Sequence, residues 1–93
     1  MNPHQLVEEL LNLTHEYSKL AEAWADCIAY QAQFFNEKRQ DYKSDNACQK
    51  AFDFTERGIS MQVIKAKLKS KEKRMSAIRT AVRLAEVEAR NIL

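Results

Sequence analysis

The chain has 93 residues, which is room for a single domain, and it carries a formal net charge of only +2. It contains one glycine and one proline, and its content of Ala, Leu, Glu, Lys, Gln and Arg is typical of long helices rather than of sheets. The lone glycine excludes a glycine-rich phosphate-binding loop, and no apolar run is long enough for a membrane span or an export signal. We therefore expect one all-α domain over residues 1–93, located in the cytoplasm.

The first predicted helix covers about residues 3–42. Pro3 suits its first turn, and Asn2 is a suitable N-cap residue. Apolar residues then recur with alternating steps of four and three, the spacing of a helix that packs along another helix, at Leu6, Leu10, Leu13, Tyr17, Leu20, Trp24, Cys27 and Phe34. Gln31 is the one polar member of this series. Further apolar residues lie on both flanks, so we expect this helix to contact two neighbours.

The segment 43–46 predicts a turn, because Ser, Asp and Asn bond nearby backbone N–H groups. A short second helix is expected at about 46–57, starting at Asp45, with Gly58 in the left-handed position just past its end. The third helix is expected at about 60–92 and capped by Ser60. Its apolar residues again step by three and four, at Met61, Ile64, Leu68, Met75, Ile78, Val82, Ala85, Ala89 and Ile92. Lys71 interrupts this series.

Folding the third helix back antiparallel on the first pairs positions whose numbers sum to about 99. In that register Gln31 and Lys71 meet in one polar layer, a feature that commonly fixes the register of a heptad seam. Lys67 and Arg74 then face Tyr30 and Ala23, so the acidic first helix neutralises the third only in part. The predicted fold is an antiparallel hairpin of two long helices with a short connecting helix, assembled into a dimeric helical bundle of coiled-coil type.

No residue pattern has the spacing of a catalytic or metal site. Cys27 and Cys48 lie far apart, with no Cys-x-x-Cys pair and no His close enough for zinc spacing. They are expected as small buried hydrophobes in a reducing compartment. A second set shares one face of the first helix but is spread over too many turns to bind one ion: His4, Glu8, His15 and Glu22. We therefore expect no enzyme activity, no catalytic residue, no cofactor and no metal.

Charge is distributed unevenly, since residues 1–37 carry one Lys and six acids while residues 59–93 carry nine basic residues and three acids. Five basic residues fall on the outer half of the third helix, where a phosphate backbone could reach them: Lys65, Lys69, Lys73, Arg79 and Arg83. Three interpretations stay open. These residues bind nucleic acid, pair with the acidic helix of another subunit, or are solvated. No aromatic residue is interleaved with them, which disfavours single-strand binding by stacking.

Spare apolar surface predicts partner contacts. A single core in so short a chain stabilises a monomer only modestly, and contiguous apolar patches on helices usually mark interfaces. The residues expected at an oligomer interface are Leu11, Ala25, Ala32, Leu84 and Val87. The leading functional hypothesis is a non-enzymatic helical protein that forms a homo-oligomer and binds a further protein partner through its helix faces. The alternative is a nucleic-acid-binding accessory protein that uses the basic face.

The tract from Arg74 to Asn91, RMSAIRTAVRLAEVEARN, resembles the C-terminal helix of uncharacterised small helical proteins encoded in bacteriophage genomes. The likeness covers about a fifth of the chain and carries over no catalytic residue. It implies a phage accessory or anti-defence protein that acts by occlusion in the host cytoplasm.

Overall fold

The computed structural model describes residues 2–92 and consists of helices joined by short turns. The helices are α1 (Pro3–Lys38), the short 3-10 helix η1 (Arg39–Asp41), α2 (Asp45–Asp53) and α3 (Glu56–Ile92). No strand occurs among the described residues. The all-α class predicted from the sequence is confirmed, and α1 ends four residues earlier than predicted because its last turn tightens into η1.

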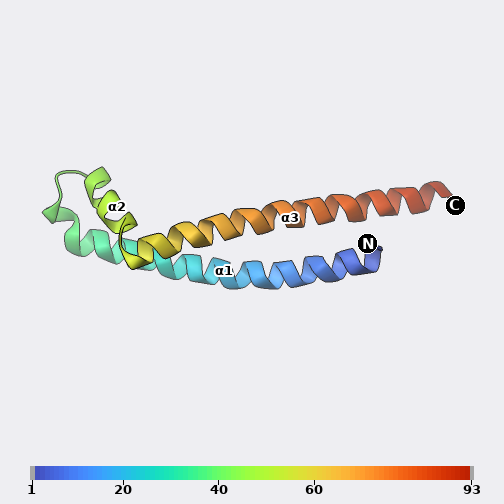
Figure 1. Cartoon of the computed structure of the whole chain (residues 1–93), viewed down its shortest axis with the longest axis horizontal. Helices are drawn as coiled ribbons and strands as arrows, with labels where there is room; N and C mark the ends of the chain where they lie inside the picture. Colours follow the sequence, from blue (N-terminus) through green and yellow to red (C-terminus); the bar gives the residue numbers. More distant parts are fainter. Residues whose placement is uncertain (1, 93) are drawn as a thin grey trace.

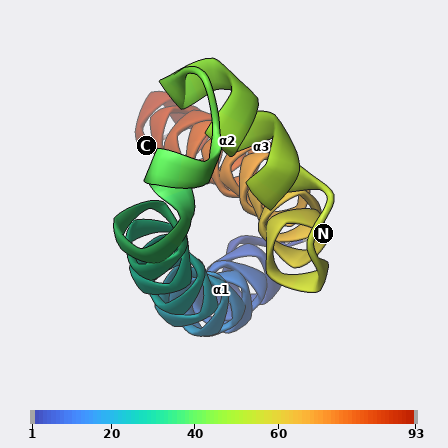
Figure 2. The same ribbon diagram turned by 90° about the vertical axis from the view of Figure 1, so that its left-hand side faces the viewer.

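The two long helices lie side by side and run in opposite directions (Figure 1). They form a rod of 68 × 20 × 16 Å, and the last turns of α3 extend beyond the start of α1. We call the end of the rod that holds α2 the closed end. Figure 2, seen from this end, shows α2 in front of α3 and to one side of α1, and α2 contacts both long helices. Helix α1 therefore contacts two neighbours, α2 and α3, as predicted, although most of the apolar residues that flank its seam are exposed.

Local capping chemistry fixes the start of α1. The Asn2 side chain accepts a hydrogen bond from the Gln5 backbone N–H at 2.8 Å, and the Gln5 side chain accepts one from the Asn2 N–H at 3.1 Å. This reciprocal capping box satisfies two amide groups that the first turn of a helix leaves without partners. Pro3 occupies the first helical position, as predicted.

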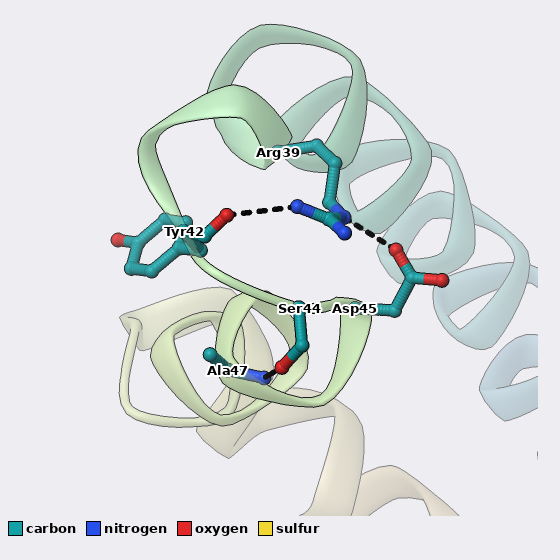
Figure 3. A network of polar contacts seen from close by, with 5 residues as sticks. All are labelled: Arg39, Tyr42, Ser44, Asp45 and Ala47. Carbon is teal, nitrogen blue, oxygen red and sulfur yellow. Dashed lines mark hydrogen bonds and ion pairs between the residues drawn. The ribbon is translucent and has the colours of Figure 1, made fainter.

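The turn between α1 and α2 is held by the side chain of Arg39 (Figure 3). Its guanidinium donates to the Tyr42 carbonyl oxygen at 2.8 Å and forms an ion pair with Asp45. The N-cap of α2 is Ser44, whose hydroxyl accepts a hydrogen bond from the Ala47 N–H at 3.1 Å. Helix α2 thus begins at Asp45, as predicted, but it ends at Asp53 rather than near residue 57.

The junction between α2 and α3 differs from the predicted one. Helix α3 begins at Glu56, so Ser60 lies inside the helix and does not cap it. Thr55 is the residue before the helix, and its hydroxyl accepts a hydrogen bond from the Gly58 N–H at 3.1 Å. Gly58 does not adopt a left-handed conformation. A Cβ there would lie 2.8 Å from the Cα of Asp53 and would overlap the Phe52 carbonyl oxygen. The glycine therefore permits close packing of α3 on α2.

The predicted register of α1 on α3 is wrong. Glu16 contacts Lys71, Tyr17 contacts Glu72, and the Arg57 guanidinium lies 3.9 Å from the ring centroid of Tyr30. The numbers in each of these pairs sum to about 88 rather than 99. The reason is that α2 packs on the last turns of α1, so α3 begins level with the Gln31 region.

Consequently the two polar interruptions do not meet. Gln31 donates a hydrogen bond to the Gln49 side chain of α2 at 2.6 Å, whereas Lys71 reaches Glu16. A polar layer therefore forms between α1 and α2 and not within the seam of the long helices.

The core is small and lies in two places. At the closed end Cys27, Cys48 and Phe52 are buried, and the Phe52 ring packs edge-on against Phe34 with centroids 5.5 Å apart. Along the α1–α3 seam the buried side chains are Met75 and Ile78. Both cysteines are buried free thiols, as predicted. The remaining surface is extensive because a two-helix rod covers little of each helix.

Candidate interaction surfaces

The described residues hold no arrangement that resembles a metal centre. No group of three or more His, Cys, Asp or Glu side chains within this part of the chain lies close enough to hold an ion. Within residues 2–92 no helix is apolar over a length sufficient to cross a bilayer. The features that remain are charged and apolar surfaces of the two long helices.

Polar contacts join α1 to α3 along one edge of the seam. The Lys71 ammonium lies 2.6 Å from Glu16, and the Arg74 guanidinium lies 2.7 Å from Glu9. The hydrogen bond and the charge of Lys71 lower the pKa of the Glu16 carboxyl below its ordinary value. Arg74 was predicted to face Ala23, and the shifted register places Glu9 within its reach instead. The acidic residues of α1 therefore neutralise more of the positive charge of α3 than the register predicted from the sequence would allow.

Tyr17 makes a further link, because its hydroxyl donates a hydrogen bond to Glu72 at 2.7 Å. This bond is made by the neutral phenol, so it raises the pKa of Tyr17 above 10. Glu72 is the one acid within the basic stretch of α3 from residue 65 to residue 83. Its carboxylate is thus turned toward α1.

The five basic residues predicted as a nucleic-acid contact form one flank of α3. All five side chains are exposed, and none makes an ion pair with a described residue. Their spacing places them on the same side of the helix over about 27 Å. We call Lys65, Lys69, Lys73, Arg79 and Arg83 the basic flank. The structure brings these residues together and leaves their charges uncompensated within the part of the chain that it describes.

A second heptad series runs along α1 beside the seam that packs on α3. It contains no charged residue over nine positions, and we call it the α1 stripe: Val7, Leu11, Thr14, Ser18, Ala21, Ala25, Ile28, Ala32 and Phe35. Most of these side chains are exposed, and Leu11 is 65% accessible. Ala21 and Phe35 are half-buried.

A comparable series runs along the side of α3 that faces away from α1. We call it the α3 stripe, and it comprises Ile59, Val63, Ala66, Ser70, Lys73, Ala77, Thr80, Leu84 and Val87. Its single charge belongs to Lys73. Ile59 is 54% and Leu84 is 58% accessible. At the closed end it continues toward Phe54, an aromatic residue that is 84% exposed.

The five residues predicted at an oligomer interface divide between these two stripes. Leu11, Ala25 and Ala32 belong to the α1 stripe, while Leu84 and Val87 belong to the α3 stripe. The register places Leu84 level with the first turn of α1, on the far side of α3. The predicted residues therefore lie on two separate surfaces.

Sequence reasoning missed Val63, Ile59 and Phe54 as exposed apolar residues. The third helix was predicted to begin at about residue 60, so Phe54 and Ile59 lay outside it. The signal was present, because the step of four and three that defines the α3 stripe can be counted directly from Ile59 to Val87.

Comparison with known proteins finds no matching family model, no matching curated protein and no matching solved structure. The resemblance of the Arg74–Asn91 tract to phage-encoded proteins therefore stays a prediction.

Proposed function

We propose that this protein is a non-enzymatic interaction module that binds a protein partner through exposed apolar helix faces. The observation that carries the proposal is the α3 stripe. Its large exposed apolar side chains form two groups, Ile59 with Val63 near the closed end and Leu84 with Val87, about 31 Å further along α3. Exposed apolar groups on a small protein mark partner contacts, and anchors spaced by three and four within each group suit a partner helix.

Two paired substitutions test the proposal. Val63→Glu with Leu84→Glu places two charges on the α3 stripe, while Gln62→Glu with Ser76→Glu places two charges on exposed positions of the neighbouring flank. Each tagged variant is used to capture proteins from an extract of its source cell. We expect a protein retained by the wild type and by the control pair to be lost from the stripe pair. Equal retention by all three chains would contradict the proposal.

The basic flank supports a second candidate function, which is contact with a nucleic-acid backbone. Five uncompensated cations on one side of a helix attract phosphates without reading base sequence. Binding of a labelled duplex, followed by fluorescence anisotropy, should then weaken with salt by a log–log slope of about −0.9 for each phosphate contacted.

A charge-matched control separates this flank from net charge alone. Lys69→Glu, Lys73→Glu and Arg83→Glu together should abolish duplex binding. The same number of reversals at the exposed closed-end residues Lys38, Lys43 and Lys50 should leave most of it. If the wild type does not bind at low salt, where attraction between charges is least screened, the nucleic-acid candidate fails.

A further inference from the structure

A groove lies between α1, α2 and α3 near the closed end. It holds about 390 Å³, a volume within the roughly 300 to 1,000 Å³ of ligand pockets in proteins. Each helix contributes polar or aromatic side chains to its lining, which includes Trp24, Gln31, Gln49, Asp53, Gln62 and Lys65. We call it the Trp24 groove. Because Lys65 belongs both to this groove and to the basic flank, the groove lies at one end of the row of uncompensated cations.

Trp24 supplies an aromatic surface in this groove. It is half-buried and is the only tryptophan of the chain. The register predicted from the sequence would set it opposite Met75, and no aromatic residue is interleaved with the cations along α3. In the observed register, facing residue numbers sum to about 88, which sets Trp24 level with residue 64 and in one groove with Lys65. The structure thus joins an aromatic ring to the basic flank, the combination that binds single strands by stacking.

The polar side chains of the groove are held in place by one another. Gln31 donates a hydrogen bond to Gln49 at 2.6 Å, and Gln49 donates one to Asp53 at 2.8 Å. These bonds use one N–H of each glutamine, so a second N–H of each, the Gln31 carbonyl oxygen and one Asp53 oxygen are not used by them. Such groups pair with the edges of unpaired bases. A carboxylate also accepts a hydrogen bond from an exocyclic amine, such as that of cytosine.

We propose that the Trp24 groove binds an unpaired base of a single-stranded nucleic acid, with the base stacked on the indole ring and the adjoining phosphates on the basic flank. The proposal rests on the second candidate function, because the flank must bind phosphates. Of the two charged residues in the groove, Asp53 repels a phosphate and Lys65 attracts it. The strand therefore leaves the groove past Lys65 toward Arg83, over about 27 Å of α3. A duplex keeps its bases paired, so it contacts the flank alone.

The fluorescence of Trp24 tests the proposal, because no other tryptophan contributes to it. A labelled oligomer of about 10 deoxycytidines, within the roughly 4 to 16 nucleotides of single-strand sites, should quench this fluorescence as it binds at low salt. A duplex of the same length should bind without quenching. Cytidine monophosphate at the same base concentration is the control for collisional quenching. A single strand that binds, as its anisotropy would show, and leaves the fluorescence unchanged would overturn the proposal.

Substitution of Trp24 measures the contribution of stacking. Trp24→Leu keeps an apolar side chain in the seam and should weaken single-strand binding about 5- to 150-fold, the effect of one stacked base, while duplex binding stays unchanged. Trp24→Tyr retains a ring and should keep most of the affinity. Equal single-strand affinity for the wild type and Trp24→Leu would overturn the proposal, and so would equal losses for single strand and duplex.

A second variant decides the case if Trp24→Leu does not fold, which circular dichroism would show. Gln62→Glu places a negative charge at an exposed position of the groove and should weaken single-strand binding. Gln40→Glu adds the same charge at the closed end, outside the lining of the groove, and is the matched control. Equal single-strand affinity for these two variants would count against the groove as the site.

The outcomes separate this inference from the second candidate function. A duplex that binds through the flank, while no single strand quenches Trp24, would leave that function standing and remove the inference. Absence of binding by both ligands would remove both. The ribocytidine oligomer, titrated in the same way, distinguishes RNA from DNA, because the strand that quenches Trp24 at the lower concentration is the one that the groove prefers.

Discussion

Replacing Gly58 with alanine should destabilise the protein, although alanine is the better helix former. Gly58 lies within α3, where an exposed alanine would gain about 1 kcal/mol. Here the added methyl group would overlap the Phe52 carbonyl oxygen and lie 2.8 Å from the Cα of Asp53. These are backbone atoms of α2 and cannot rotate away, so the two helices must separate. Overpacking of this kind costs about 3 kcal/mol at the upper end of its usual range.

The net loss for Gly58→Ala is therefore about 2 kcal/mol, which corresponds to a fall in Tm of about 8 to 16 °C for a domain of this length. Urea unfolding followed by circular dichroism measures it, at a concentration at which the protein is monomeric. Ala66→Gly, at an exposed position of the same helix, is the control and should cost about 1 kcal/mol. An unchanged or raised stability for Gly58→Ala would refute the close packing of α3 on α2.

Two further substitutions and one reactivity measurement test the core and the seam. Lys71 lowers the pKa of Glu16 in the folded protein below the ordinary value of 4.5. The stability that this pair contributes is therefore present above pH 4.5 and is lost as the pH falls through the pKa of Glu16 in the folded protein. Glu16→Gln should make the stability of the protein less dependent on pH in this acid range. Phe52→Ala should cost about 3 to 5 kcal/mol in urea unfolding, because it empties the closed-end core. The thiols of Cys27 and Cys48 should react with a thiol reagent slowly in the native protein and rapidly in urea, since both are buried. Fast native reaction would show that the closed end is open in solution.

The sequence by itself determined the features that depend on neighbours along the chain. The Asn2 cap, a break at Lys43 and Ser44, the long helices and their apolar seams all follow from spacings of three and four residues and from capping chemistry. The burial of both cysteines also follows, because each is a small apolar side chain on a predicted packing face. The basic flank could be listed from the sequence, since five spaced cations share one side of any helix that contains them.

Only the tertiary structure decided how the long helices align. The predicted and observed registers differ by about 11 residues, close to three helical turns, so apolar residues still meet apolar residues in either one. The choice between them depends on Phe52 packing against Phe34, which commits the last turns of α1 to α2. The same packing decides that Gly58 must lack a side chain and that Arg74 reaches Glu9. Leu11 and Leu84 also lie on different faces of the rod. The contact of Phe52 with Phe34 joins segments that are distant in the sequence, and it determines at which residues α1 and α3 meet.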